Sequence, residues 1–251
     1  MSKTPFIIIT LPRSGSYHLR ALLDSAPDIR CYGEIFKGSE VELPPEELAL
    51  VGLTKKETAK RDEMGMAILN RLRKKTDAAG QIFGFKDFRF NLTRAKIYSQ
   101  IANSKGWRKV FLFRNPVERF ISMERASLTG VFVVTEKNKN REGLDLKRPI
   151  RFDAHRFEQS MGSHRNLTRD ARQALDKLGP EVVHLLDYTR LNELDTRKAL
   201  MGFLGSAGDG ALLASDHVKQ FTAPLESGVE NWDEMQAYLE STQQMDLLPG
   251  R

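Results

Sequence analysis

The chain has 251 residues, of which 29% are charged and 40% hydrophobic, and its formal net charge is +6. This balance excludes an intrinsically disordered chain, and the basic excess favours an anionic ligand without pointing to nucleic acid. One cysteine and five scattered histidines exclude an internal disulfide and predict no metal site.

The first element expected along the chain is a strand over residues 6–10, FIIIT, which is apolar throughout. Such a run is typical of a strand buried on both faces. A helix over 16–25 follows, with Leu19, Leu22 and Leu23 at helical spacing. The apolar run is too short for a signal-peptide core or a membrane span, so we expect a cytoplasmic protein.

The rest of the chain alternates between helical patterns and short apolar runs. Residues 40–52 are expected to form a connection or a short helix, and 136–151 a charged surface loop. Thr54 and Glu57 have the spacing of a capping box at the start of a helix. The expected strands are 81–88, 109–113 and 181–186, and the expected helices are 54–79, 94–105, 116–128, 157–178, 191–204 and 229–241.

This alternation predicts an α/β fold, a P-loop-like three-layer domain with a central parallel sheet flanked by helices. We expect one domain over 1–251, with a variable charged loop at about 129–152.

The turn after the first strand has the composition of an anion site. Pro12-Arg13-Ser14-Gly15-Ser16 joins the strand to the helix. Ligands of parallel sheets bind at this edge, where a helix N-terminus offers free N–H groups. The turn lacks the leading glycine and the lysine of the nucleoside-triphosphate loop, which argues against a kinase or a Mg-nucleotide hydrolase.

A second pair of anion-binding side chains follows the third predicted strand. Arg114 ends that strand, and Ser122 lies eight residues later, about two turns into the next helix. An arginine and a hydroxyl at the same edge of the sheet would grip a second anionic group.

With these two motifs, the chain resembles the sulfotransferases that use 3′-phosphoadenosine 5′-phosphosulfate (PAPS), in particular the carbohydrate- and lipid-type members with a carboxylate base. The resemblance spans roughly residues 5–235 and is weakest at 36–80 and 129–155. It implies that a turn of the form P-[KR]-[ST]-G-[ST] holds the 5′-phosphosulfate and that an Arg–Ser pair holds the 3′-phosphate. The implied donor-binding residues are Arg13, Ser14, Gly15, Ser16, Arg114, Ser122, Tyr188 near the adenine and, by a looser match, Lys219.

The resemblance also suggests the groups for the chemistry. Arg13 and Lys86 are expected to stabilise the charge on the leaving oxygen and the transferred group. Arginine is a poor proton donor, so Arg13 is expected to act by its charge alone. The histidine base of many cytosolic relatives is replaced by Phe88. The carbohydrate- and lipid-type relatives instead use a glutamate after the first helix, and the resemblance implies Glu34 as that general base, with Asp87 as the alternative.

The sequence thus predicts an enzyme that moves a sulfuryl group from PAPS, without a metal, to a hydroxyl of a carbohydrate, glycolipid or small metabolite. A nucleotide-dependent phosphotransferase on the same fold and a non-catalytic polyanion-binding module are the alternatives. No nucleic-acid partner and no transmembrane segment are expected, and a homo-oligomer is compatible with the sequence.

Overall fold

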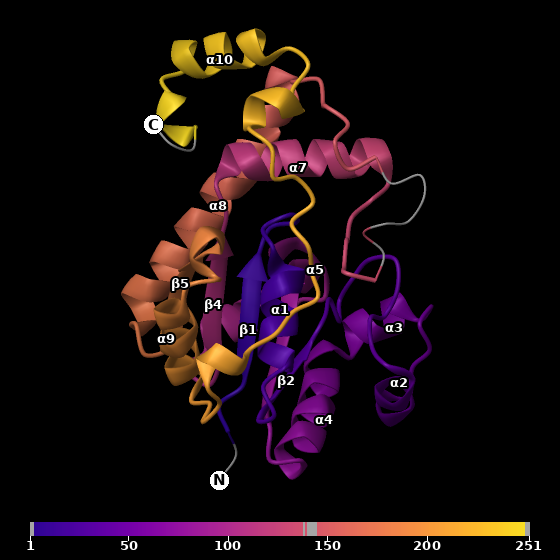
Figure 1. The fold of residues 1–251 in the computed structure, drawn as a ribbon. Coiled ribbons are helices and arrows are strands. Elements are labelled where there is room, and N and C mark those ends of the chain that lie inside the picture. Colours follow the sequence, from indigo (N-terminus) through magenta and orange to yellow (C-terminus); the bar gives the residue numbers. More distant parts are fainter. Residues whose placement is uncertain (1–2, 138, 140–144, 249–251) are drawn as a thin grey trace.

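A computed structural model describes residues 3–137, 139 and 145–248, and its centre is a five-stranded sheet (Figure 1). The strand order is β2-β3-β1-β4-β5, and every neighbouring pair is parallel. The strands are β1 (Phe6–Thr10), β2 (Ile29–Tyr32), β3 (Ile82–Phe88), β4 (Arg108–Phe113) and β5 (Val183–Asp187).

Helices cover both faces of this sheet. Side chains of α1 (Ser16–Asp24) and α9 (Leu194–Leu204) pack on one face, together with Phe6 and Ile8. The other face carries Ile7 and Ile9 and is covered by α2 (Pro45–Val51), α4 (Gly65–Ala78), α5 (Arg89–Arg94), α6 (Tyr98–Ala102) and α8 (Ala154–Leu178). Because successive side chains of a strand point to opposite faces, the run FIIIT supplies both cores. The predicted three-layer α/β class is confirmed.

The remaining elements lie outside these layers. They are α3 (Thr58–Glu63), α7 (Pro116–Thr129), α10 (Trp232–Ser241) and the short 3₁₀ helices η1 (Tyr188–Arg190), η2 (Gly210–Leu212), η3 (Leu225–Gly228) and η4 (Met245–Leu247). In Figure 1, α7 and α10 lie above the upper ends of the strands. No helix in the described part of the chain is long and apolar enough to cross a membrane.

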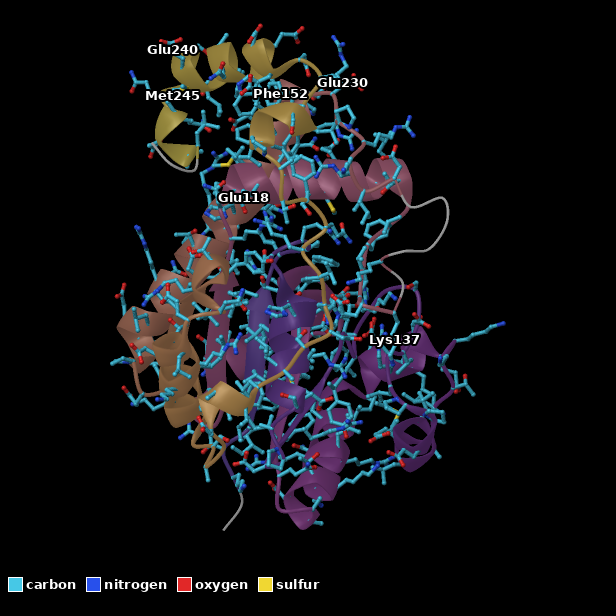
Figure 2. The ribbon with its side chains drawn as sticks, viewed as in Figure 1. Glu118, Lys137, Phe152, Glu230, Glu240 and Met245 are labelled. Carbon is cyan, nitrogen blue, oxygen red and sulfur yellow. The ribbon has the colours of Figure 1, made fainter. Side chains whose placement is uncertain are left out.

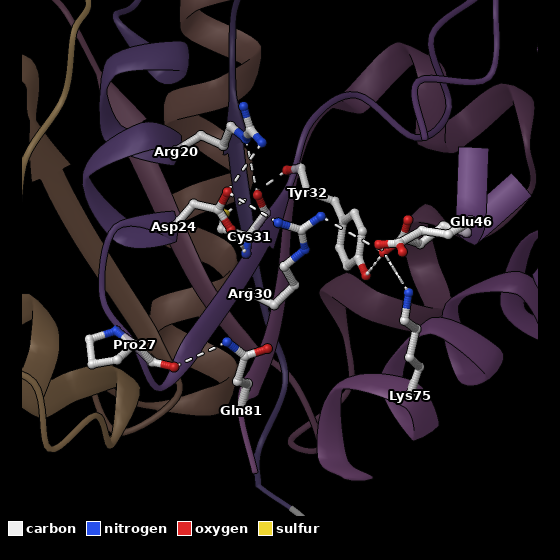
Figure 3. Close-up of polar contacts among 10 residues, drawn as sticks. Arg20, Asp24, Pro27, Arg30, Cys31, Tyr32, Glu46, Lys75 and Gln81 are labelled. Carbon is white, nitrogen blue, oxygen red and sulfur yellow. Dashed lines mark hydrogen bonds and ion pairs between the residues drawn. The ribbon is translucent and has the colours of Figure 1, made fainter. Parts of the chain in front are cut away.

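The edge strand β2 was not predicted from the sequence. It has only four residues, and its Arg30 is half-buried and ion-pairs with Asp24 at 3.5 Å and Glu47 at 3.8 Å (Figure 3). Arg20 of α1 donates to the Cys31 carbonyl oxygen at 3.0 Å. Charged side chains from other elements thus cover this edge, and such contacts leave no periodic signal in the sequence.

The predicted helix over 54–79 is wrong in its extent. Glu57 does accept from the Thr54 backbone N–H at 2.7 Å, but the helix begins only at Thr58. It is broken at Met64, so that α3 and α4 are separate. A Cβ on Gly65 would lie 2.8 Å from Ile97 Cγ2, so the glycine lets α4 pack closely against the α5–α6 connection.

The predicted helix over 94–105 is also wrong. Two short helices, α5 and α6, replace it, and Lys96 between them has a φ of 57°. A left-handed residue ends a helix, and nothing in the local composition indicates it.

A third apolar cluster, here called the upper cluster, lies beyond the carboxyl ends of the strands. Its aromatic centre is Phe120, Phe152 and Phe157, with ring centroids 5.3–6.1 Å apart. Figure 2 shows Phe152 in this part of the molecule, next to α10. The cluster consists of Val117, Phe120, Ile121, Ile150, Phe152, Phe157, Met161, Val229, Met235, Leu239 and Leu248.

The predicted charged loop at about 129–152 lies partly outside the described residues. Its described part is tied to the C-terminal region by isolated bridges from Thr135 to His217 and from Ile150 to Val229. The single-domain organisation stays a prediction.

Candidate active site

The predicted anion-binding turn lies at the carboxyl end of β1 and leads directly into α1. Ser14 and Ser16 are buried there, 1% and 4% exposed. Gly15 is the residue before the helix and has a φ of +81°. A Cβ at this position would lie 2.1 Å from Cε2 of Tyr188, so only glycine accommodates both the conformation and the aromatic ring. The structure therefore brings Tyr188 onto the turn.

Arg13 of the same turn reaches across to α7. Its Nε donates to Ser122 Oγ at 3.1 Å and its Nη2 to Gln220 Oε1 at 2.6 Å, and its Nη1 donates to the Phe132 carbonyl oxygen. All of these acceptors are neutral, and no carboxylate of the described chain forms an ion pair with Arg13. Burial, and then the neighbouring Arg114, lower the pKa of Arg13 to about 10.

Arg114 lies beside this turn, after the end of β4. Its Nη1 donates to the Arg13 carbonyl oxygen at 3.1 Å, and its guanidinium lies 4.9 Å from the centre of the Tyr188 ring. Its Nε ion-pairs with Glu118 at 3.1 Å. Arg13, Arg114, Ser122 and Tyr188 therefore meet in one place, called here the arginine group, although up to 175 residues separate them in the chain (188 − 13 = 175).

Two further arginines lie near this group on α7, and the sequence reasoning missed both. Arg119 and Arg125 are each 4% exposed, and burial followed by the charge of Arg114 lowers the pKa of both. Arg119 donates to the Ser160 carbonyl oxygen at 3.0 Å, and Arg125 to that of Arg148 at 3.0 Å. Among the described residues, Glu118 pairs with Arg114 and Asp145 acts on Arg125, so the four arginines outnumber the carboxylates beside them. Such a group suits a ligand carrying several negative charges.

Lys219 is not brought into this group. It makes no hydrogen bond or ion pair within the described chain, whereas the next residue, Gln220, contacts Arg13. The segment passes over the anion-binding turn, so a late polar residue does reach the site. The residue of this segment that contacts Arg13 is thus Gln220, one position after the Lys219 that the sequence match had indicated.

A second group of side chains surrounds Lys86, at the end of β3. The Lys86 side chain is fully buried, and its Nζ forms a close ion pair with Glu34 Oε1. The ammonium also lies 4.1 Å from the ring centre of Tyr17 and 4.4 Å from that of Phe88. Burial lowers the pKa of Lys86, and the Glu34 carboxylate opposes that shift. The structure thus joins two of the predicted catalytic residues.

Asp87 points away from this pair and has a different environment. Its carboxylate accepts hydrogen bonds from the backbone N–H groups of Phe36 and Phe88 and from Asn91 Nδ2, each at 2.8 Å. Burial raises its pKa to about 7. Because its oxygens are occupied by the protein, Asp87 holds the chain after Glu34 in place.

The two groups flank the first turn of α1. The turn residues before the helix belong to the arginine group, while Tyr17, the second residue of the helix, covers Lys86. His217 stacks on Tyr17 with ring centroids 6.1 Å apart, a contact that the sequence did not indicate. No cluster of three or more His, Cys, Asp or Glu side chains suited to a metal occurs among the described residues.

Comparison with known proteins identifies the fold. No family model matches the sequence. The chain is similar to the "Sulfotransferase Domain from the Synechococcus PCC 7002 Olefin Synthase" (TM-score 0.51, 17% identity, 92% of this chain and 84% of that one). It is also similar to the "Sulfotransferase Domain from the Curacin Biosynthetic Pathway" (TM-score 0.51, 16% identity, 90% and 82%). The chain therefore has the fold of the sulfotransferase domains, and the predicted resemblance is confirmed at the level of the fold.

A curated relative is detected from the sequence as well. Nodulation protein H of Rhizobium tropici is 24% identical over 141 residues, which cover 55% of this chain and 53% of that protein. The match thus spans about half the length of either protein.

Proposed function

We propose that the protein transfers a sulfuryl group from PAPS to a hydroxyl of an acceptor. The observation that carries the proposal is the contact between Arg13 and Ser122, with Arg114 on the Arg13 backbone oxygen. Two anion-binding segments, a hundred residues apart in sequence, meet at the N-terminus of α1, where backbone N–H groups are free to bind an anion. The sulfotransferase fold supports the same function.

In this proposal the arginine group holds the donor. The turn from Arg13 to Ser16 binds the 5′-phosphosulfate, and Arg114 and Ser122 bind the 3′-phosphate. Tyr188 lies against Gly15 and offers an aromatic surface for the adenine. Arginine stays charged through the reaction, so Arg13 stabilises negative charge on the leaving oxygen without giving up a proton.

The Lys86 group performs the proton chemistry. Glu34 accepts the proton of the attacking hydroxyl, and the Lys86 ammonium pairs with that carboxylate and stabilises the transferred group. A carbohydrate, glycolipid or small metabolite is proposed as the acceptor, on the strength of the carboxylate base. The cytoplasmic location and a homo-oligomeric state stay predictions.

The donor assignment is tested by thermal unfolding with adenosine 3′,5′-bisphosphate or ATP-Mg²⁺. A ligand of the folded state at 100 times its Kd stabilises the protein by about 2.7 kcal/mol. For a chain of this size, we expect the bisphosphate to raise Tm by roughly 5–10 °C and ATP-Mg²⁺ to raise it less. A larger shift with ATP-Mg²⁺ would indicate the phosphotransferase instead. A polyanion-binding module would instead bind a polyanion with an affinity that falls steeply with salt, and neither nucleotide would change that binding.

Variants locate the donor site and the base. We expect Arg114→Ala to abolish most of the rise in Tm caused by the bisphosphate, because a charged contact to phosphate is lost. The control is Arg165→Ala, which removes an arginine with a 57% exposed side chain on α8 and should leave that rise unchanged. Glu34→Gln should retain bisphosphate binding and lose turnover by about 10²–10⁴-fold, the usual contribution of a general base. Full turnover of Glu34→Gln would exclude Glu34 as the base.

A further inference from the structure

The hydroxyl of Tyr17 lies near two carboxylates. Its Oη donates to Glu42 Oε2 at 3.3 Å. Glu34 is close to the same side chain, because its Oε1 pairs with Lys86 Nζ, which lies 4.1 Å from the centre of the Tyr17 ring. Burial, then Glu42 and Glu34, raise the pKa of Tyr17 well above its usual value. The phenol therefore keeps its proton, and it joins the proposed base to a second carboxylate.

The proposed base has little contact with solvent. Glu34 is 7% exposed, and its partner Lys86 is fully buried. An ammonium group has no lone pair, so Lys86 cannot accept a proton from Glu34. A base that gains a proton in every turnover needs a way to lose it before the next turnover.

Glu42 connects this buried pair to an open cavity. The cavity has a volume of about 260 Å³, and its lining includes Gly33 and Glu42, whose side chain is 29% exposed. A Cβ on Gly33 would lie 2.1 Å from Glu42 Oε1, so the missing side chain lets this carboxylate reach the wall next to Glu34. Arg20, Arg30 and Tyr32 form another part of the wall, along the β2 edge in Figure 3.

We propose that Tyr17 and Glu42 form a relay that carries the acceptor proton from Glu34 to the water in this cavity. The proposal rests on the proposed function. As the acceptor oxygen bonds to sulfur and the bridging S–O bond of the donor breaks, the acceptor proton moves to Glu34. Glu34 then gives a proton to Tyr17 Oη while Tyr17 gives its own to Glu42 Oε2, and Glu42 releases it to water. Glu34 and Glu42 end as carboxylates and Tyr17 as a neutral phenol, so the protein is unchanged.

The charged groups around the relay are compatible with this path. Lys86 faces Glu34 and the Tyr17 ring, and the Lys37 ammonium lies 4.0 Å from Glu42 Oε2. Neither ammonium has a lone pair that could take the proton. His217 covers the ring face of Tyr17, and its Nδ1 contacts Ser215 and Asp216.

Tyr17→Phe tests the relay, because it removes the hydroxyl and keeps the ring on Lys86 and His217. The assay follows release of adenosine 3′,5′-bisphosphate from PAPS, with water and with a panel of methyl glycosides as acceptors. We expect Tyr17→Phe and Glu42→Gln to lower turnover about tenfold or more, while calorimetric binding of the bisphosphate stays within about twofold of wild type. Added imidazole should restore the rate of both variants in proportion to its concentration, since a diffusible base replaces the relay.

The matched control is Glu46→Gln, a carboxylate on α2 with a 71% exposed side chain that pairs with Lys75 at 3.4 Å. It should keep wild-type turnover and show no response to imidazole. The relay is wrong, and the proposed function stands, if Glu34→Gln is inactive but Tyr17→Phe keeps full turnover. The same holds if the turnover of Tyr17→Phe falls but does not respond to imidazole. If the wild-type protein neither binds the bisphosphate nor releases it from PAPS, both proposals are wrong.

Discussion

Gly15 is the residue on which the anion-binding turn depends most directly. Its φ of +81° and the Tyr188 ring, 2.1 Å from the position of a Cβ, both exclude a side chain. We expect Gly15→Ala to lower the free energy of unfolding by about 2–4 kcal/mol, from left-handed strain of about 1–2 kcal/mol and the displaced ring. Urea unfolding measures the first effect, and calorimetry should show weaker binding of adenosine 3′,5′-bisphosphate.

Gly52→Ala separates backbone strain from loss of the site. Gly52 has a φ of +70°, but a Cβ there would meet nothing within 4 Å. This variant should lose about 1 kcal/mol of stability and bind the bisphosphate normally. Equal losses of stability and of binding in both variants would contradict the proposed role of the Tyr188 contact.

Lys109 in β4 makes stability depend on pH. Burial lowers its pKa to about 8, from 10.5 for a solvated lysine, and within the described residues its Nζ donates only to the Ser104 carbonyl oxygen. Between about pH 8 and 10.5 the unfolded chain holds more protons on this amine than the folded protein, so the free energy of unfolding should rise with pH.

Lys109→Met should remove this rise and stabilise the protein at pH 7 by about 1–3 kcal/mol, because the buried charge disappears. Urea unfolding from pH 7 to 10.5 checks both effects. A parallel rise in the variant would show that another group is responsible.

Among individual residues, the sequence indicated the side chains that belong to a local motif. It did not indicate those whose partners lie far away in the chain. Arg13, Gly15 and Ser16 stand in one turn, and Arg114 and Ser122 have a fixed spacing, so composition and position were sufficient. Tyr17, Glu42 and Gln220 acquire their roles only through contacts with other segments. Neither periodicity nor a motif encodes those contacts.

Among the elements, the long central strands were predictable and the region around Glu34 was not. Strands buried on both faces are continuous apolar runs, which are visible in the sequence. Strand β2, the break at Met64 and the pair α5–α6 depend on tertiary packing instead. Arg61 of α3 is an example of such packing. It is fully buried and donates to the carbonyl oxygens of Lys37 at 2.6 Å and Glu40 at 3.1 Å.

Arg61→Ala should therefore disorder the segment after Glu34. We expect a loss of about 3 kcal/mol in the free energy of unfolding, because several buried carbonyl groups lose their donor. Hydrogen exchange should speed up in residues 35–41, and turnover should fall. Arg71→Ala, an exposed arginine on α4 that donates to the Val51 carbonyl oxygen at 3.2 Å, is the control. Unchanged exchange in 35–41 of Arg61→Ala would contradict this role.

For the whole molecule, the position of α7 links the proposed donor site to the upper cluster. One side of α7 supplies Val117, Phe120 and Ile121 to that cluster, while Ser122 contacts Arg13 at the sheet edge. The helix begins at the cap of Asn115, whose Oδ1 accepts from Val117 N and Glu118 N at 3.0 Å. The cluster on the far side of α7 thus fixes where its arginines and its serine lie.

Loss of packing in the upper cluster should consequently weaken donor binding. Leu239 of α10 is fully buried in that cluster, and Leu72 of α4 is fully buried beneath the sheet. Leu239→Ala and Leu72→Ala should each lower the free energy of unfolding by about 2–5 kcal/mol.

Only Leu239→Ala should raise the Kd of adenosine 3′,5′-bisphosphate, by about tenfold if the loosened α7 loses roughly 1.4 kcal/mol of contact with the ligand. Calorimetry at a temperature where both variants remain folded makes the comparison. Equal Kd values would mean that the cluster supports the fold alone, because a general loss of stability acts on both variants alike.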